Sequence, residues 1–247
     1  MKRLFDIVAS AFGLLLASPI LLPVVLLVWW QDKHSPFYVA ARTGKDDQPF
    51  KMVKLRSMVI NADKSGVDST GANDHRITPL GQFIRRYKLD ELSQLWNVLI
   101  GDMSLVGPRP NVKRETDLYT PVERRLITVK PGITDFSSIV FSDEGDILKD
   151  AADPDIAYNQ LIRPGKSALG LYYVDKSSLW LDIQLCVITV VTIFSRARAL
   201  RELQSVMARM GAPTELMRVA SRAEPLVPMP PPGGERIVTS RDGNPFA

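Results

Sequence analysis

The longest apolar stretch of the chain lies near its start. Residues Ile7 to Trp30 run for 24 positions without a formal charge. A helix rises about 1.5 Å per residue, so this length suffices to cross a hydrocarbon core of about 30 Å. A cleavable signal peptide is the alternative, because Lys2 and Arg3 precede the stretch, but its apolar region normally spans only about 7–15 residues. We therefore expect a membrane segment.

Two prolines interrupt this segment near its middle. Pro19 follows Ser18, and Pro23 lies about one turn later. Proline lacks an amide N–H and clashes with the preceding turn, so we expect a kink, or membrane break, at Ser18-Pro19. Basic residues flank both ends, Lys2 before and Lys33 after, and give no orientation for a straight crossing. A re-entrant hairpin with both ends in the cytoplasm and a kinked spanning helix both fit this pattern.

Short apolar runs separated by a polar turn follow the membrane segment. Phe37–Ala40 and Phe50–Leu55 flank the polar residues Arg42–Asp47, which predicts a β-hairpin. Residues 61–74 are rich in Gly, Ser, Asp and Asn without a clear period, which predicts a mobile loop. Helical periodicity begins at Leu80.

A predicted helix in the middle of the chain carries two adjacent carboxylates. Apolar residues recur at helical spacing, at Leu89, Leu92, Trp96 and Leu99. Gly101 offers the end of this helix, so Asp90 and Glu91 fall in its first turn. Acidic residues there commonly cap free N–H groups and complement the helix dipole. The side chains of adjacent residues on a helix point about 100° apart. The two carboxylates therefore cannot face each other across a substrate, as the acid/base pair of a glycosidase does.

The last third of the chain is first apolar, then basic, then rich in proline. Leu179 to Phe194 is interrupted by Asp182 and is too short to cross a membrane, so we expect a buried or interface-lying helix. Four arginines between 196 and 209 predict a basic amphipathic surface segment over residues 196–223. The proline-rich tail, 224–247, is expected to be disordered.

Composition excludes several kinds of site. The net charge of +4 and the pI near 9.2 suit anionic partners such as phosphates and lipid headgroups, and we expect no nucleic acid partner. The single Cys186 excludes an intramolecular disulfide. With only His34 and His75 besides, the chain has no Cys/His zinc pattern, and it has no Walker A or GxSxG motif.

An ordered set of motifs runs through roughly residues 1–195. The central ones are Arg85-Arg86-Tyr87-Lys88-Leu89-Asp90-Glu91-Leu92 and Gly107-Pro108-Arg109-Pro110. The others are Lys2-Arg3-Leu4-Phe5-Asp6, Ser18-Pro19, Phe50-Lys51-Met52-Val53-Lys54-Leu55-Arg56-Ser57-Met58, Lys130-Pro131-Gly132-Ile133-Thr134 and Tyr172-Tyr173-Val174. Together they resemble the bacterial sugar transferases, the monotopic phosphoglycosyl transferases that initiate glycan assembly.

The resemblance implies an α+β fold and a role for each matching residue. A re-entrant membrane helix-break-helix, 1–33, would precede a small cytosolic α/β catalytic domain, 34–195. Asp90 would be the nucleophile and Glu91 would act in metal binding or proton handling, with both near the family cofactor Mg²⁺. Arg85 and Arg109 would bind substrate phosphate.

The reaction implied is transfer of a sugar-1-phosphate from a nucleotide diphosphosugar to polyprenyl phosphate. A uridine nucleotide, undecaprenyl phosphate and the cytoplasmic face of the bacterial inner membrane are also implied, as is a role in starting exopolysaccharide, O-antigen or glycoprotein glycans. The residue chemistry agrees, because a carboxylate can attack a phosphoryl group and give an aspartyl phosphosugar intermediate. Direct attack by the acceptor, a truly spanning transferase and a non-enzymatic membrane-anchored interaction protein are the alternatives.

The chain departs from the family pattern beside these motifs. Tyr87-Lys88 stands where the family often has Thr-Ser, and Ser93 stands where it often has Pro. Asp135-Phe136-Ser137-Ser138 replaces the Gly-Trp-Ala-Gln of many relatives. These departures bear on the identity of the sugar more than on the type of reaction.

Overall fold

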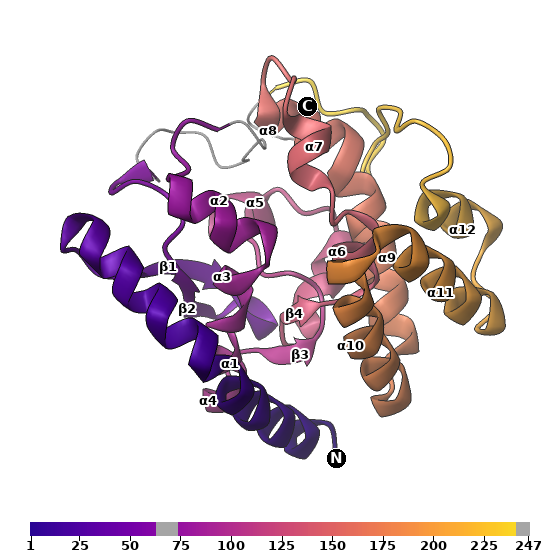
Figure 1. Ribbon diagram of the computed structural model, residues 1–247. Coiled ribbons are helices and arrows are strands. Elements are labelled where there is room, and N and C mark those ends of the chain that lie inside the picture. The colour runs from indigo at the N-terminus through magenta and orange to yellow at the C-terminus, as the bar shows by residue number, and fades with distance from the viewer. Residues whose placement is uncertain (63–73, 241–247) are drawn as a thin grey trace.

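An N-terminal helix, α1 (Lys2–Asp32), is the longest element of the computed structural model, which describes residues 1–62 and 74–240. Pro19 lies inside α1 without ending it, and Figure 1 shows a change of direction along the helix. Pro19 has no N–H to donate to the Leu15 carbonyl, and the Ser18 hydroxyl donates to that carbonyl instead, at 2.8 Å. The Ser18-Pro19 pair is thus accommodated within one continuous helix, and the re-entrant arrangement stays a prediction.

One side of α1 packs on the protein, and the other side is apolar and exposed. Val24 and Val28 are buried in a small cluster with Leu55, Ile84 and Leu89. By length and composition α1 could cross a membrane, and only 17% of its most apolar window is buried. Its large exposed side chains include Leu4, Val8, Phe12, Leu15, Leu16, Ile20, Leu22, Leu26 and Trp30. This apolar face suggests membrane association.

The first turns of α1 are fastened to the core by charged side chains. Lys2 Nζ donates to the buried carboxylate of Asp182 at 2.5 Å and to the Val106 carbonyl at 3.1 Å. The buried carboxylate of Asp6 accepts a hydrogen bond from the Leu105 amide at 3.0 Å. The motif that begins at Lys2 therefore joins the apolar helix to the rest of the fold.

The predicted β-hairpin is confirmed. β1 (Phe37–Thr43) pairs antiparallel with β2 (Pro49–Leu55), and η1 (Lys45–Asp47) lies in the connection. The loop predicted over residues 61–74 falls largely on 63–73, which lie outside the described residues.

The helix predicted over residues 89–99 is divided into two short helices, α3 (Leu89–Leu92) and α4 (Leu95–Ile100). The buried Ser93 hydroxyl donates to the Asp90 carbonyl at 2.8 Å. A side-chain donor thus satisfies a carbonyl that an amide would satisfy in a continuous helix. Ser93 and Gln94 keep right-handed helical angles, but the Gln94 amide donates to the Glu91 carbonyl three residues back, so the regular α-helical pattern of α3 ends after a single turn.

The helix boundaries on either side of this break agree with the sequence. α2 (Pro79–Arg86) begins where the helical period starts, and the Thr78 hydroxyl caps it by accepting from the Gly81 amide at 2.9 Å. α4 ends at Gly101, whose φ of 102° lies in the left-handed region that favours glycine.

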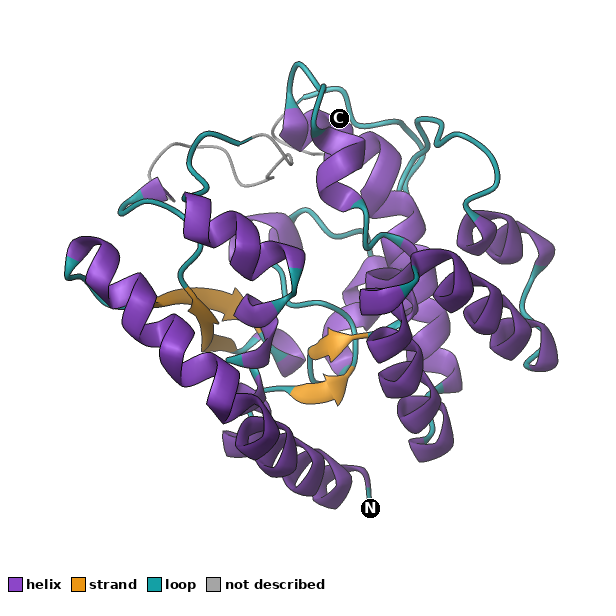
Figure 2. Ribbon diagram, in the orientation of Figure 1, coloured by secondary structure: helices purple, strands orange, loops and turns teal. Residues whose placement is uncertain are grey.

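Short elements connect these helices to the C-terminal half. β3 (Ser104–Val106) pairs in parallel with β4 (Gly132–Thr134). The short helices of this part are α5 (Lys113–Asp117), η3 (Glu123–Thr128), α6 (Phe136–Val140), α7 (Glu144–Leu148), α8 (Pro154–Ala157) and η4 (Tyr158–Ile162). Figure 2 shows the two small sheets inside a surround of helices. The fold therefore combines helices and sheets, as the predicted α+β class requires.

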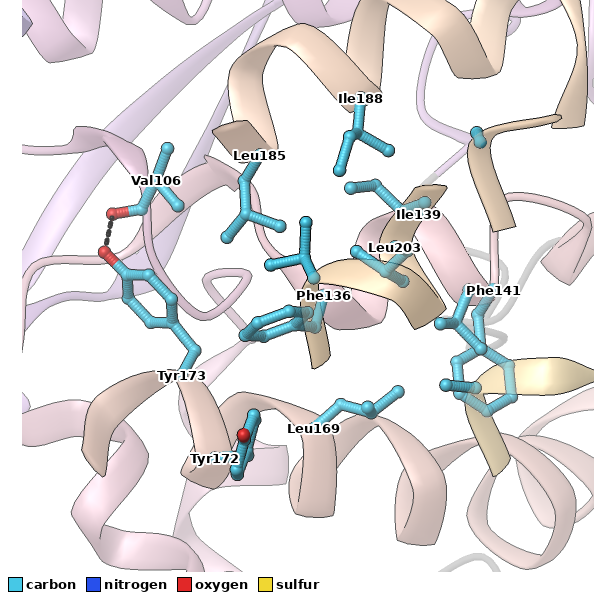
Figure 3. Close-up of a cluster of buried hydrophobic side chains, with 14 of the residues drawn as sticks. Val106, Phe136, Ile139, Phe141, Leu169, Tyr172, Tyr173, Leu185, Ile188 and Leu203 are labelled. Atoms are coloured by element: carbon cyan, nitrogen blue, oxygen red, sulfur yellow. Dashed lines mark hydrogen bonds between the residues drawn. The ribbon is translucent and has the colours of Figure 1, made fainter. Parts of the chain in front are cut away.

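Helices from the C-terminal half enclose the main hydrophobic core. α9 (Arg163–Lys176) and α10 (Leu179–Phe194) contribute much of it, and α10 has the predicted bounds. Figure 3 shows Phe136 beside Tyr172. The centroids of the two rings lie 5.6 Å apart. The Tyr173 hydroxyl donates to the Val106 carbonyl at 3.0 Å, which ties α9 to β3.

The segment after residue 195 completes this core. α11 (Arg196–Arg209) and α12 (Thr214–Ser221) bury apolar side chains in it, while several arginines of α11 are exposed. We expected disorder after Glu224, yet residues 224–240 follow an irregular path against the protein. The Gln160 amide donates to the Val238 carbonyl at 2.7 Å, and Val238 is buried. Residues 241–247 lie outside the described part of the chain.

Candidate active site

The adjacent carboxylates Asp90 and Glu91 lie in α3, as predicted. Lys88 precedes the helix with a φ of 56°, so the chain turns sharply into α3. Asp90 Oδ1 is buried and has no hydrogen-bond partner among the described residues. A buried carboxylate oxygen without a partner is costly, and in a native structure it commonly marks a reactive or ligand-binding group.

Glu91 forms an ion pair with Arg109. The Arg109 guanidinium comes from the loop after β3 and donates to Glu91 Oε1 at 3.1 Å. The pair is only partly buried, with 32% of the Arg109 side chain and 19% of the Glu91 side chain exposed. Arg109 thereby keeps part of its fork open to a ligand, which suits phosphate binding.

The two carboxylates have opposite pKa shifts. Burial raises the pKa of Asp90, and the negative charge of Glu91 raises it further against the opposing charges of Lys54 and Lys88. Burial also raises the pKa of Glu91, but the charges of Arg109, Lys88 and Lys54 outweigh it and hold this pKa at about 2. Asp90 is therefore the more basic carboxylate, and Glu91 is the one that stays ionised at neutral pH.

Lys54 is a member of this cluster that the sequence analysis did not single out. It lies on β2 and is half-buried. Burial and the charge of Arg109 lower its pKa to about 8, against the charges of Asp90 and Glu91, which raise it. Its position inside the Phe50–Met58 motif was the available signal, but a lysine on a hairpin strand is more often a solvated side chain.

Arg85 approaches the cluster without touching either carboxylate. Its Nε donates to the Ser57 hydroxyl at 2.9 Å, which fixes the guanidinium beside the end of β2. Burial lowers the pKa of Arg85, and the charge of Asp90 is the largest influence that raises it. Ser18 and Pro19, the other predicted residues, lie in α1, and the Ser18 hydrogen bond stays within that helix.

The acidic groups fit a sparse metal site. Among the described residues no group of three or more His, Cys, Asp or Glu side chains is placed to hold a metal ion. Mg²⁺ commonly binds through one or two carboxylates together with waters and substrate phosphates. The partnerless oxygen of Asp90 and the neighbouring Glu91 supply that minimal set.

Known proteins are similar in sequence to this chain over most of its length. A family model described as bacterial sugar transferase matches residues 1–196. A UDP-N-acetylgalactosamine-undecaprenyl-phosphate N-acetylgalactosaminephosphotransferase of Aeromonas hydrophila is 32% identical over 197 residues, covering 78% of this chain and 44% of the relative. A UDP-glucose:undecaprenyl-phosphate glucose-1-phosphate transferase of Klebsiella pneumoniae is 36% identical over 193 residues, covering 76% of this chain and 39% of the relative.

A shorter relative matches along nearly all of its own length. An uncharacterized sugar transferase of Bacillus subtilis is 35% identical over 190 residues, covering 77% of this chain and 85% of the relative. The two longer relatives, by contrast, are matched over less than half of their length. The activities in their names therefore belong to larger proteins, of which this chain resembles one part.

Proposed function

Because the chain belongs to the bacterial sugar transferase family, we propose that it transfers a sugar-1-phosphate from a UDP-sugar to undecaprenyl phosphate. The observation that carries the proposal is the unequal pair in α3. Asp90 has a partnerless buried oxygen and a raised pKa, whereas Glu91 is neutralised by Arg109. The substrates follow those in the names of the Aeromonas and Klebsiella relatives.

In this proposal Asp90 is the nucleophile. Its carboxylate attacks the phosphorus that bears the sugar, and the bond from that phosphorus to the bridging diphosphate oxygen breaks. Uridine monophosphate leaves with the electron pair, and an aspartyl phosphosugar remains. An oxygen of undecaprenyl phosphate then attacks the same phosphorus, and the carboxylate of Asp90 is released. The raised pKa makes Asp90 the better nucleophile of the two carboxylates.

The cations of the site have the complementary role. Attack by an anion on a diphosphate requires that negative charge be neutralised, and phosphoryl transfer depends mainly on such positioning and electrostatics. The charges of Lys54 and Arg109 lower the pKa of Asp90, and the charge of Asp90 raises the pKa of Arg85. Bound at Asp90 and Glu91, Mg²⁺ would add further charge neutralisation to the diphosphate.

We further propose that the reaction takes place at the cytoplasmic face of the bacterial inner membrane. A polyprenyl chain keeps its tail in lipid and its phosphate at the headgroup level. The exposed apolar face of α1 would hold the protein at that level, where both substrates meet. Exopolysaccharide synthesis is the pathway class that the name of a Rhizobium meliloti relative supports.

A labelling experiment without acceptor tests the mechanism. With a UDP-sugar carrying a radiolabelled sugar and Mg²⁺ but no lipid, the covalent route should give protein-bound label and at most one equivalent of uridine monophosphate per site. Asp90→Asn should abolish both, and Glu91→Gln should reduce them. A rapid-quench result with no bound label, in enzyme that turns over once acceptor is added, would favour direct attack in a ternary complex. A folded protein that turns over no UDP-sugar would favour the non-enzymatic alternative.

A further inference from the structure

A second charged cluster lies near the site and has no part in the reaction described above. Lys166 of α9 donates from Nζ to Glu144 Oε2 of α7. The same Nζ lies 5.3 Å from the ring centroid of Tyr158 in η4. Only 14% of the Lys166 side chain and 32% of the Glu144 side chain are exposed. We call Glu144, Tyr158 and Lys166 the second cluster.

The backbone under this cluster is unusual. η4 is a π-helix, and such widened turns occur mostly as single insertions in helices, frequently at functional sites. Its Gln160 side chain donates to the Val238 carbonyl at 2.7 Å, and its Gln160 carbonyl accepts from the Met229 amide at 3.1 Å. The C-terminal segment thus braces the turn that carries Tyr158.

The second cluster keeps polar groups unused. Within the described residues, Glu144 Oε1 and the Tyr158 hydroxyl make no hydrogen bond, and neither is a fully buried atom. Burial raises the pKa of Tyr158 well above 10, so its hydroxyl stays neutral and able to donate. Lys166 Nζ has three donors, of which the contact to Glu144 uses one. A ligand therefore finds one acceptor, one hydroxyl and a cationic donor together.

The charges of Arg109 and of Glu144 in the second cluster influence each other. The charge of Glu144 raises the pKa of Arg109 more than the charge of Asp90 does, and only Glu91 acts more strongly among the carboxylates. Burial raises the pKa of Glu144, but the charge and hydrogen bond of Lys166 and the charges of Arg109 and Lys88 outweigh it and lower this pKa. Arg109 therefore lies in the field of carboxylates from two elements, α3 and α7, which Figure 1 shows well separated.

From this arrangement we propose that Glu144, Tyr158 and Lys166 bind hydroxyl groups of a polyhydroxylated ring of the donor, either its sugar or its ribose. The inference rests on the proposed function. A carboxylate and an ammonium cancel in charge, so the cluster suits an uncharged diol better than a second phosphate. A diphosphate held at Arg109 would bring its attached rings to within reach of neighbouring side chains.

Three conservative variants test the proposal: Glu144→Gln, Lys166→Met and Tyr158→Phe. Each is compared with the wild type for UDP-glucose, UDP-galactose and their N-acetylamino counterparts. We expect kcat/KM to fall roughly 10- to 100-fold for the affected donors in Glu144→Gln and Lys166→Met, where a hydrogen bond to a charged group is lost, and roughly 2- to 10-fold in Tyr158→Phe, where a neutral one is lost. Glu215→Gln and Arg218→Met, in an exposed ion pair of α12, serve as matched controls and should change nothing.

The two sources of hydroxyl groups give different outcomes. If the cluster binds the sugar, the ratio of kcat/KM between donors changes and inhibition by uridine monophosphate does not. If it binds the ribose, KM rises equally for every donor and inhibition by uridine monophosphate weakens. Donor kinetics within twofold of wild type in all three folded variants would overturn the proposal. A change confined to the KM of undecaprenyl phosphate would also overturn it.

Calorimetry separates this proposal from the proposed function. A wild type that binds UDP-sugars without turning them over would contradict the proposed reaction alone, and the variants would then be compared by Kd. A wild type that neither binds nor turns over any UDP-sugar would contradict both. Melting temperatures of all variants, measured in the same detergent, identify any variant that has simply unfolded.

Discussion

Asp90 and Glu91 are neighbours in sequence, but their side chains meet different surroundings. Arg109 contacts Glu91 directly, whereas Asp90 Oδ1 has no such contact within the described residues. The turn after Lys88 allows this difference, because adjacent residues on a helix point in different directions. The carboxylate without a partner and the carboxylate neutralised by an arginine are thus adjacent residues.

Asp90→Asn is expected to abolish turnover and to raise the melting temperature at pH 7. Folding raises the pKa of Asp90, which means that the ionised carboxylate destabilises the folded state. The neutral amide of asparagine does not carry this cost. The expected rise is about 2–4 °C for each 1 kcal/mol recovered in a chain of this size. Calorimetry beside the release of uridine monophosphate checks both halves.

The pH dependence of this effect gives its control. A group with a raised pKa contributes stability below its unfolded value and loses that contribution as the pH rises through the folded value. The gain from Asp90→Asn should therefore shrink toward pH 3.8, the ordinary value for aspartate. Asp150→Asn, at an exposed position, should leave the melting temperature unchanged at both pH values. A lower melting temperature in Asp90→Asn at pH 7 would contradict the argument.

Lys54 should limit activity on the alkaline side. Its pKa of about 8 means that the free enzyme loses this cation, and with it affinity for the donor diphosphate, above that pH. We expect kcat/KM for the donor to fall as the pH rises through 8, and Lys54→Arg to keep activity to higher pH. A pH profile of both proteins measures this, and identical alkaline limbs would exclude Lys54 as the titrating group.

The sequence predicted the central residues of the candidate site but not all of the residues around them. Asp90, Glu91 and Arg109 were all predicted, and the Arg109–Glu91 ion pair joins two motifs that are 18 residues apart. Lys54 was missed because its role depends on how β2 packs against α3, which no local pattern encodes. Arg85 was predicted from its motif, but its Nε is directed to Ser57.

At the scale of elements, local signals succeeded where they act within a few residues. The hairpin and α10 follow from turn residues and apolar runs, and both were predicted. The division between α3 and α4 was not, because it depends on Ser93, whose hydroxyl donates to the Asp90 carbonyl and also lies 3.3 Å from the Val53 carbonyl of β2. The end of α3 is thus a position where a local hydrogen bond and a tertiary contact meet.

The Ser18-Pro19 pair of α1 should decide its topology. Pro19→Ala restores the amide donor to Leu15 and should straighten the helix toward a true span. With tags at both termini, we expect the N-terminal tag to be unreactive from outside the cell in the original protein and reactive in Pro19→Ala. The C-terminal tag should be unreactive in both. An N-terminal tag that reacts from outside in the original protein would refute the re-entrant topology.

At the scale of the whole molecule, residues beyond the matched family region belong to the same structure. α11 and α12 contribute Leu203, Met207 and Leu216 to the main core. The segment that follows packs against η4 through Val238 and the Gln160 side chain. This packing could not be predicted from a periodic pattern, because a proline-rich irregular segment has the same composition whether it packs against the protein or is disordered.

Val238→Ala should lower the stability of the protein. Val238 is 1% exposed, and removing its two methyl groups should cost about 1.5 kcal/mol. Ile237 is 41% exposed, so Ile237→Ala is the matched control and should have no effect beyond a few tenths of a kcal/mol. Thermal melting in detergent measures both. Equal effects of the two substitutions would show that the segment is not packed.

The contact between Lys2 and Asp182 also sets an order of events during synthesis. The carboxylate that holds the first turn of α1 is made 180 residues after Lys2. Ribosomes add roughly 5–20 residues per second, so Lys2 waits on the order of ten to forty seconds for its partner. The N-terminal end of α1 therefore has no partner at this carboxylate until the chain has been made as far as α10. The ion pair between Lys2 and Asp182 can form only after most of the chain has been synthesised.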